Sequence, residues 1–286
     1  MFSEIIKDLE TKLLLLTSKN LESGEILATT ENGSTLSVEN AWHLLNINSK
    51  KDAYLLDSIV ETSRTIKTNL FHGKIYSIVP LYVSSYCQEH CVYCNYRAGN
   101  RDKKIERVRL TNAELEIEVE FLAKKGFRAI ELVYATDPFT TVNDVSHHIG
   151  ITSEILSTFG GGIVGINARP YLVEDYRRLK NAGLDFVVLW QETYDEIRYK
   201  ELHPGKTEKR DFFYRLNAPE RMIQAGIENI GLGVLSGLHD WRKDWYLLIH
   251  HVAFLLETYK EKIKTIILGI PRLKPAFGAL LRETPK

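Results

Sequence analysis

Six short apolar segments alternate along this chain with stretches of helical periodicity, and this alternation limits the folds open to it. Each apolar segment is rich in β-branched or aromatic residues, as buried parallel strands are. The predicted strands are residues 75–85, 129–135, 163–168, 186–191, 230–235 and 265–270. Since helices separate successive strands, we predict an α/β fold with a six-stranded parallel sheet. The spacing alone fits both an open doubly wound sheet and a barrel.

Helix signals lie between the predicted strands. Thr111 and Glu114 have capping-box spacing, apolar residues follow at helical spacing, and Gly126 ends the segment. Further helices are predicted at residues 39–45, 52–65, 173–182, 219–225 and 241–259. We therefore predict a mostly helical N-terminal extension over residues 1–74 and an α/β domain over residues 75–286.

All the cysteines of this chain lie in one short segment. They are Cys87, Cys91 and Cys94, directly after the first predicted strand. An odd number of cysteines cannot be fully paired as disulfides, and such dense spacing would not staple a domain of this size. Parallel α/β folds place ligand sites at the carboxyl ends of their strands. The segment therefore predicts a metal site in a reducing compartment.

Two kinds of metal site fit three clustered thiols. Three thiolates can ligate three irons of a four-iron, four-sulfur (4Fe-4S) cluster, which leaves the fourth iron open to a small molecule. The alternative is a zinc knuckle with His90 as the fourth ligand. Zinc sites usually combine one Cys-x2-Cys pair with a distant second pair, and no cysteine follows Cys94. We therefore favour the cluster.

The cysteine loop resembles that of the radical S-adenosylmethionine (SAM) superfamily, since it reads Cys-x3-Cys and has an aromatic residue, Tyr93, before its last cysteine. The resemblance implies a radical SAM core, a partial (β/α)6 TIM-type barrel. It also implies a 4Fe-4S cluster on the three cysteines and SAM on the open iron. Reductive cleavage of SAM then gives a 5′-deoxyadenosyl radical, and Tyr93 lies against the adenine.

A longer run of residues, about 75 to 275, resembles the tyrosine lyases among these enzymes. The run includes Gln-Glu-Thr-Tyr at 191–194 and His-Pro-Gly at 203–205. These lyases comprise the 2-iminoacetate synthases of thiamine biosynthesis and the iron-iron hydrogenase maturases. The resemblance implies cleavage of the Cα–Cβ bond of tyrosine to 2-iminoacetate (dehydroglycine) and p-cresol. Without a cysteine after Cys94, it does not extend to the second cluster of the maturases.

Five further residues are candidates for cofactor binding, and none is assigned a catalytic role. Where the family has Gly-Glu after the second strand, this chain has Ala-Thr-Asp-Pro, so Asp137 is the candidate for the amino group of SAM. Arg169 and Arg215 are candidates for carboxylates, which arginine binds in a bidentate manner. Gln191 and Glu192 end the fourth predicted strand, and at least one should face the site.

Other functions remain open at this stage. One alternative is a radical SAM enzyme that acts on another amino acid or in hydrogenase-cofactor maturation. Another is a truncated, non-catalytic iron-sulfur protein that serves as a partner or regulator, because the family continues for two further barrel units. We expect a small-molecule amino-acid substrate, with tyrosine favoured, and a biosynthetic partner protein is an open possibility.

A basic run follows the cysteine loop. It consists of Arg97, Arg101, Lys103, Lys104, Arg107 and Arg109. It fits either a solvated loop or a dock for an acidic flavodoxin or ferredoxin that delivers the electron, since complementary charge speeds encounter.

Charge and hydropathy exclude several classes of partner. Lysine plus arginine and aspartate plus glutamate each number 37, so the net charge is zero, unlike that of a general nucleic-acid binder. The longest aliphatic run, residues 13–16, is far shorter than the roughly 20 residues that span a bilayer. The first ten residues are too acidic for a targeting signal. We predict a cytoplasmic protein that binds neither nucleic acid nor membrane.

Overall fold

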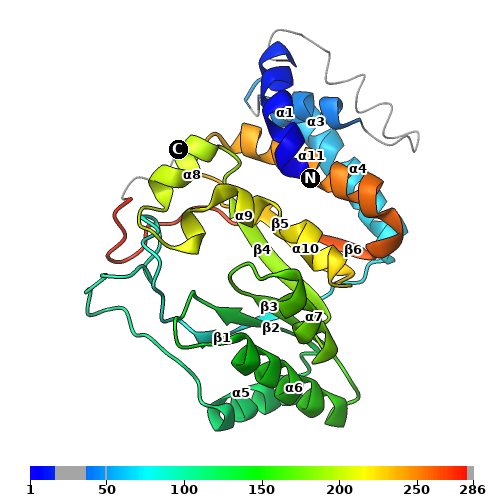
Figure 1. The fold of residues 1–286 in the computed structure, drawn as a ribbon. Coiled ribbons are helices and arrows are strands. Elements are labelled where there is room, and N and C mark those ends of the chain that lie inside the picture. Colours follow the sequence, from blue (N-terminus) through cyan, green and yellow to red (C-terminus); the bar gives the residue numbers. More distant parts are fainter. Residues whose placement is uncertain (17–36, 49, 282–286) are drawn as a thin grey trace.

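The predicted parallel sheet is confirmed by the computed structural model, which describes residues 1–16, 37–48 and 50–281. The strands are β1 Val79–Ser84, β2 Ala129–Tyr134, β3 Ile163–Asn167, β4 Phe186–Glu192, β5 Asn229–Val234 and β6 Thr265–Gly269 (Figure 1). They follow one another in sequence order, and every neighbouring pair is parallel. A doubly wound sheet reverses its strand order at a switch point, so the unbroken order identifies the wall of a partial barrel.

Helices connect successive strands. They are α5 Asn112–Lys124, α6 Val142–Thr158, α7 Val173–Asn181, α8 Glu196–Leu202, α9 Phe212–Leu216, α10 Ala218–Gln224 and α11 Trp241–Tyr259, with short 3-10 turns at Glu208–Arg210 and Lys260–Lys262. The predicted capping box of α5 is present, because Thr111 and Glu114 satisfy each other's backbone N–H groups. Thr141 and Asp144 form the same box at α6, which the apolar pattern had not identified.

The N-terminal extension is helical in its described part. It contains α1 Phe2–Leu16, α3 Val38–Leu45 and α4 Ala53–Phe71. The ring of Phe2 stacks on His251 of α11 with centroids 4.1 Å apart, and Trp42 of α3 contacts Tyr246 edge-on. Aromatic contacts therefore hold α1 and α3 against the barrel helix α11. The three helices lie together at one end of the ribbon (Figure 1). No helix in the described ranges is both long and apolar enough to cross a membrane.

Two predicted boundaries in this region were wrong. Helix α4 continues to Phe71 rather than ending at residue 65, and His72 follows it in the left-handed conformation. Residues 72–78 are then needed to connect α4 to the sheet, so β1 begins at Val79, where its pairing with Ile130 begins, and not at residue 75. Ile75 and Tyr76 are exposed accordingly.

The segment after β6 returns to the cysteine loop. The backbone N–H groups of Leu280 and Leu281 both donate to the carbonyl of Val92, at 2.7 and 2.9 Å. Arg97 Nε donates to the Gly278 carbonyl, and the Asn100 side chain donates to that of Phe277, both at 3.0 Å. The last described residues are therefore bound to the loop that follows the first strand.

Candidate active site

The three cysteines line one cavity at the carboxyl ends of the strands. It has about 770 Å³ of empty space including its open mouth, within the usual range for small-molecule sites. Tyr93, Arg169, Glu192 and Arg215 of the predicted set line it as well, together with Glu89, Trp190 and Lys209. The parallel barrel thus brings residues from four different loops and strand ends to one place, as its topology predicts.

The three cysteines are free thiols, and backbone N–H groups of the same loop donate to two of them. Cys91 is buried, and Cys87 and Cys94 are partly exposed. The backbone N–H of Glu89 donates to Cys87 Sγ at 3.4 Å, and that of Tyr96 donates to Cys94 Sγ at 3.3 Å. Such N–H groups stabilise negative charge on sulfur and tune the potential of iron-sulfur clusters.

Burial opposes free thiolates in this cavity. It raises the pKa of Cys91 to about 12 and also raises that of Cys94. A coordinating metal deprotonates a thiol outright, so the loop becomes anionic when a metal is bound. The donor set therefore suits a strongly bound cationic centre.

The positions of the donors bear on the zinc alternative. Nowhere in residues 1–16, 37–48 and 50–281 do three His, Cys, Asp or Glu side chains converge to hold one metal ion. A zinc knuckle needs four ligands on one ion. A 4Fe-4S cluster binds each thiolate through a different iron, so it needs three separated sulfurs around one space. His90, the fourth ligand of the zinc alternative, is exposed and contributes nothing to the cavity lining.

A buried charged triad forms one wall of the cavity. Lys209 Nζ lies 2.7 Å from Glu192 Oε1, and Arg215 lies 3.6 Å from the same oxygen. Arg215 Nε also donates to the Trp190 carbonyl at 2.7 Å. Although burial acts in the opposite direction, the charges of Lys209 and Arg215 lower the pKa of Glu192 to about 2. Two cations face one carboxylate, so this wall has a positive excess that suits an anionic ligand.

The backbone at the end of β4 decides which side chain faces the cavity. Glu192 has a φ of 74°, and the β4–β5 register shifts between Trp190 and Glu192. Such an irregularity re-aims side chains at a strand end. Glu192 therefore lines the main cavity, whereas Gln191 lies on a smaller one beside Arg215. Of the predicted pair, one residue faces the site.

Tyr93 is held by a histidine that was not among the predicted site residues. Its hydroxyl donates to His203 Nε2 at 2.9 Å, since His203 Nδ1 donates to the Tyr199 carbonyl at 2.7 Å. Burial and then the nearby charge of Lys209 lower the pKa of His203 to about 3. The imidazole is therefore a neutral acceptor that fixes Tyr93 in the cavity wall. Its place in the His-Pro-Gly motif was the available signal.

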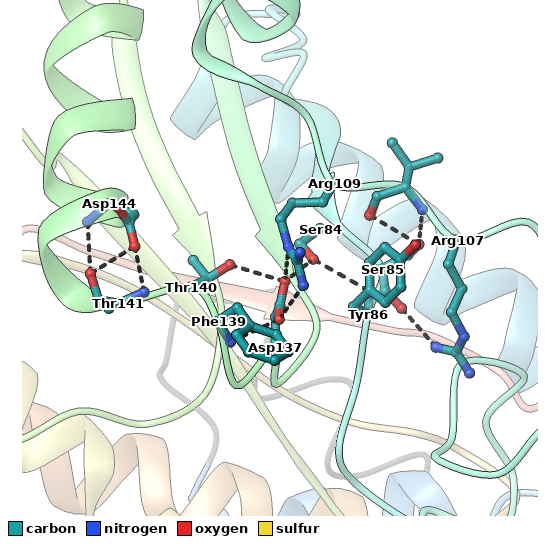
Figure 2. Close-up of polar contacts among 11 residues, drawn as sticks. Ser84, Ser85, Tyr86, Arg107, Arg109, Asp137, Phe139, Thr140, Thr141 and Asp144 are labelled. Carbon is teal, nitrogen blue, oxygen red and sulfur yellow. Dashed lines mark hydrogen bonds and ion pairs between the residues drawn. The ribbon is translucent and has the colours of Figure 1, made fainter.

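Asp137 lies outside the cavity lining, in a polar cluster of its own (Figure 2). Its Oδ2 accepts from Ser84 Oγ and Arg109 Nε at 2.6 Å and from Thr140 Oγ1 at 3.1 Å. Its Oδ1 accepts from Arg109 Nη2 at 2.7 Å and from the N–H of Phe139 at 3.0 Å. Both oxygens therefore accept hydrogen bonds from the protein itself, and the contact of Asp137 with the amino group of SAM stays a prediction.

The charged residues at the rim fall into two groups. Arg169 lines the cavity, forms a 3.7 Å ion pair with Glu208 and lies over the Tyr171 ring, 5.1 Å from its centroid. Its side chain is 38% exposed, so its guanidinium is accessible to a ligand. In the basic run after the cysteines, Arg97, Arg107 and Arg109 bind groups of the protein itself. These three arginines therefore support the loop. Arg101, Lys103 and Lys104 are exposed, as is Arg109, and Lys104 Nζ also lies 4.7 Å from the centroid of the Phe277 ring.

Comparisons with known proteins agree with this geometry. Over 239 residues the chain is 31% identical to the 2-iminoacetate synthase of Salmonella typhimurium, covering 83% of this chain and 60% of that protein. It is 28% identical over 199 residues to the 3-methylornithine synthase of Methanosarcina barkeri, covering 68% of this chain and 52% of that protein. The chain thus spans between half and two thirds of these relatives.

A solved structure shares the fold over the whole chain. The hydrogenase maturase HydG from Carboxydothermus hydrogenoformans superposes with a TM-score of 0.86 at 27% identity, covering 100% of this chain and 65% of that one. The family model for the radical SAM superfamily matches residues 81–249, which include the three cysteines, the triad and most of the sheet. Members of this family use a 4Fe-4S cluster and SAM. On this match the chain belongs to the radical SAM superfamily.

Proposed function

We propose that the chain is a tyrosine lyase that breaks the Cα–Cβ bond of tyrosine to give 2-iminoacetate and p-cresol. The observation that carries the proposal is one cavity lined by three thiols, two of them with N–H···S bonds, beside a buried cationic wall. The similarity to 2-iminoacetate synthase and the Gln-Glu-Thr-Tyr block support tyrosine as the substrate.

The thiols, Tyr93 and the charged residues of the cavity each have a role in this proposal. Cys87, Cys91 and Cys94 would hold the cluster, whose chemistry is the reductive cleavage of SAM to a radical. Tyr93, fixed by His203, offers its ring to the adenine. Arg169, Lys209 and Arg215 would attract carboxylates, and Glu192 holds Lys209 and Arg215 in place through its ion pairs.

The electron donor, the compartment and a partner protein are further parts of the proposal. A flavodoxin or ferredoxin would supply the electron in the cytoplasm, and the exposed basic residues Arg101, Lys103 and Lys104 would attract it. A biosynthetic partner that consumes 2-iminoacetate is part of the proposal, since this imine hydrolyses in water.

Anaerobic reconstitution tests the proposal. Protein loaded with iron and sulfide is reduced with dithionite in the presence of SAM and tyrosine, and p-cresol and 5′-deoxyadenosine are quantified by mass spectrometry. We expect both products from the wild type and neither from Cys94→Ala. 5′-Deoxyadenosine without p-cresol would overturn the tyrosine assignment, and other amino acids, ornithine and lysine first, would then be tried. A loaded cluster with neither product would leave the non-catalytic iron-sulfur protein.

A further inference from the structure

One arginine joins the two ends of the cysteine loop. Arg107 Nη1 donates to the carbonyls of Ser85 and Tyr96, and Nη2 donates to that of Arg97, each at 3.0 Å. Ser85 lies two residues before Cys87, and Tyr96 lies two residues after Cys94. A single guanidinium therefore spans the stretch that contains all three thiols, without contacting any sulfur.

The backbone around Arg107 is fixed to the sheet. Leu110 N donates to the Val83 carbonyl at 2.9 Å, and Ser85 N donates to that of Val108 at 2.8 Å. Val108 N in turn donates to Ser85 Oγ at 2.7 Å (Figure 2). Residues 108–110 thus run antiparallel along the end of β1, which gives the arginine a rigid base.

Arg109, two residues along, binds Asp137 and so fixes the loop after β2 to the same base (Figure 2). That loop also contacts the thiol segment directly, since Gln88 N donates to the Thr136 carbonyl at 3.0 Å. Three segments that are distant in sequence therefore meet at residues 107–109.

Arginine suits this position for a geometric reason. Its planar guanidinium presents five donors in a fixed fork, whereas a lysine ammonium has three donors around a point. Three carbonyls at 3.0 Å, two on one nitrogen and one on the other, match the fork. Bonds from a charged donor are also stronger than neutral ones, and Arg107 is partly shielded from solvent.

We infer that Arg107 is a positioning residue that sets the separation of the three cluster-binding thiols by tying the two ends of their loop together. The inference rests on the proposed assignment of Cys87, Cys91 and Cys94 as cluster ligands. Such supporting contacts around a metal centre affect its retention strongly, and their loss typically costs about 10- to 100-fold in metal affinity.

The experiment measures iron release from the anaerobically loaded protein to a chelator. We expect Arg107→Met to release iron about 10- to 100-fold faster than the wild type. Arg107→Lys should fall between them, because it keeps the charge and loses the fork. Arg101→Met, at an exposed arginine of the same segment, is the matched control and should release iron at the wild-type rate. Melting temperatures and circular dichroism verify that the variants fold.

A second readout needs no cluster. Amide hydrogen exchange in the metal-free protein reports on Glu89 and Tyr96, whose N–H groups face the sulfurs. We expect both amides to exchange faster in Arg107→Met, or in Arg107→Lys if the methionine variant does not fold. Unchanged iron release and unchanged exchange would overturn the role of Arg107. A wild type that retains no iron would instead overturn the cluster assignment, so the two failures are distinct.

Discussion

The guanidinium of Arg109 binds the carboxylate of Asp137 through two hydrogen bonds, Nε to Oδ2 at 2.6 Å and Nη2 to Oδ1 at 2.7 Å. This bidentate pair connects the segment after the cysteine loop to the loop after β2. Asp137 is the residue that the sequence predicts for SAM binding, and in the structure both of its carboxylate oxygens accept hydrogen bonds from the protein itself. The contribution of this pair to stability can be measured.

Replacing Asp137 by Asn should lower the free energy of unfolding at pH 7 by about 1.5–3 kcal/mol, because a charge-assisted pair is lost. Although burial acts in the opposite direction, the hydrogen bonds from Arg109 and Ser84 lower the pKa of Asp137 to about 2. A lowered carboxyl pKa stabilises the fold above its unfolded value of 3.8, and this contribution is lost as the pH falls toward 2.

Urea unfolding of the wild type and Asp137→Asn at pH 7 and at pH 2–3 measures this difference. The difference in unfolding free energy between the two proteins should be smaller at pH 2–3 than at pH 7. Asp57→Asn, on the exposed face of α4, should match the wild type at both pH values. A gap that is equal at pH 7 and pH 2 would contradict the ionised pair.

Substitutions in the buried triad should have strongly coupled effects on the free energy of unfolding. Glu192→Gln leaves Lys209 and Arg215 without their anion, and Lys209→Met leaves Glu192 with the 3.6 Å contact to Arg215 alone. Removing one partner of a buried ion pair typically costs about 3–5 kcal/mol. The double variant should be more stable than the sum of the two losses implies, by at least about 1 kcal/mol in a double-mutant cycle. Additive losses would mean that the pair contributes nothing as a unit.

The two parts of the Tyr93 side chain should contribute to different properties, the ring to SAM affinity and the hydroxyl to stability. Tyr93→Phe removes the bond to His203 Nε2, and leaving a buried acceptor unpaired should cost about 1–3 kcal/mol of stability. The ring remains, so SAM affinity of the loaded protein should change little. Tyr93→Ala removes the ring and should weaken SAM binding about tenfold. Isothermal titration of SAM under anaerobic conditions distinguishes the variants, and equal affinities for all three would contradict contact with adenine.

His251 should make stability depend on pH. Burial lowers its pKa from 6.5 to about 3, and its Nδ1 lies 2.9 Å from the Tyr194 hydroxyl. Between these two pKa values the unfolded chain binds a proton that the folded chain does not, so stability falls as the pH falls. One such group contributes about 1.4 kcal/mol per pH unit.

His251→Gln should reduce the slope of unfolding free energy against pH between about pH 6 and pH 4. The reduction should be nearly that of one bound proton, about 1.4 kcal/mol per pH unit. Denaturant titrations at unit pH steps measure it. His147→Gln, at an exposed histidine of α6, should retain the wild-type slope. An unchanged slope in His251→Gln would contradict a pKa of His251 that is lowered by folding.

Local patterns predicted much of the fold and part of the site. Strand and helix periods are properties of short windows, so the six strands followed from them, and the Cys-x3-Cys-x2-Cys spacing marked the thiol loop. Asp137 was assigned to the site because it follows β2, yet its partner Arg109 lies 28 residues earlier, and no local pattern encodes that pair. Lys209 was missed for a similar reason: a lysine in a polar connection normally points to solvent, and only the tertiary fold buries it against Glu192.

The return of residues 277–281 to the cysteine loop sets an order of events during synthesis. Val92 leaves the ribosome about 190 residues before Leu280, which binds its carbonyl. At 5–20 residues per second, roughly 10 to 40 s separate the two. The thiols therefore wait in an unfinished loop while the rest of the wall is made. Iron delivered during that interval would meet a cysteine loop that still lacks its hydrogen bonds to Leu280 and Leu281. The path of the chain therefore makes the state of the loop depend on when the metal is delivered.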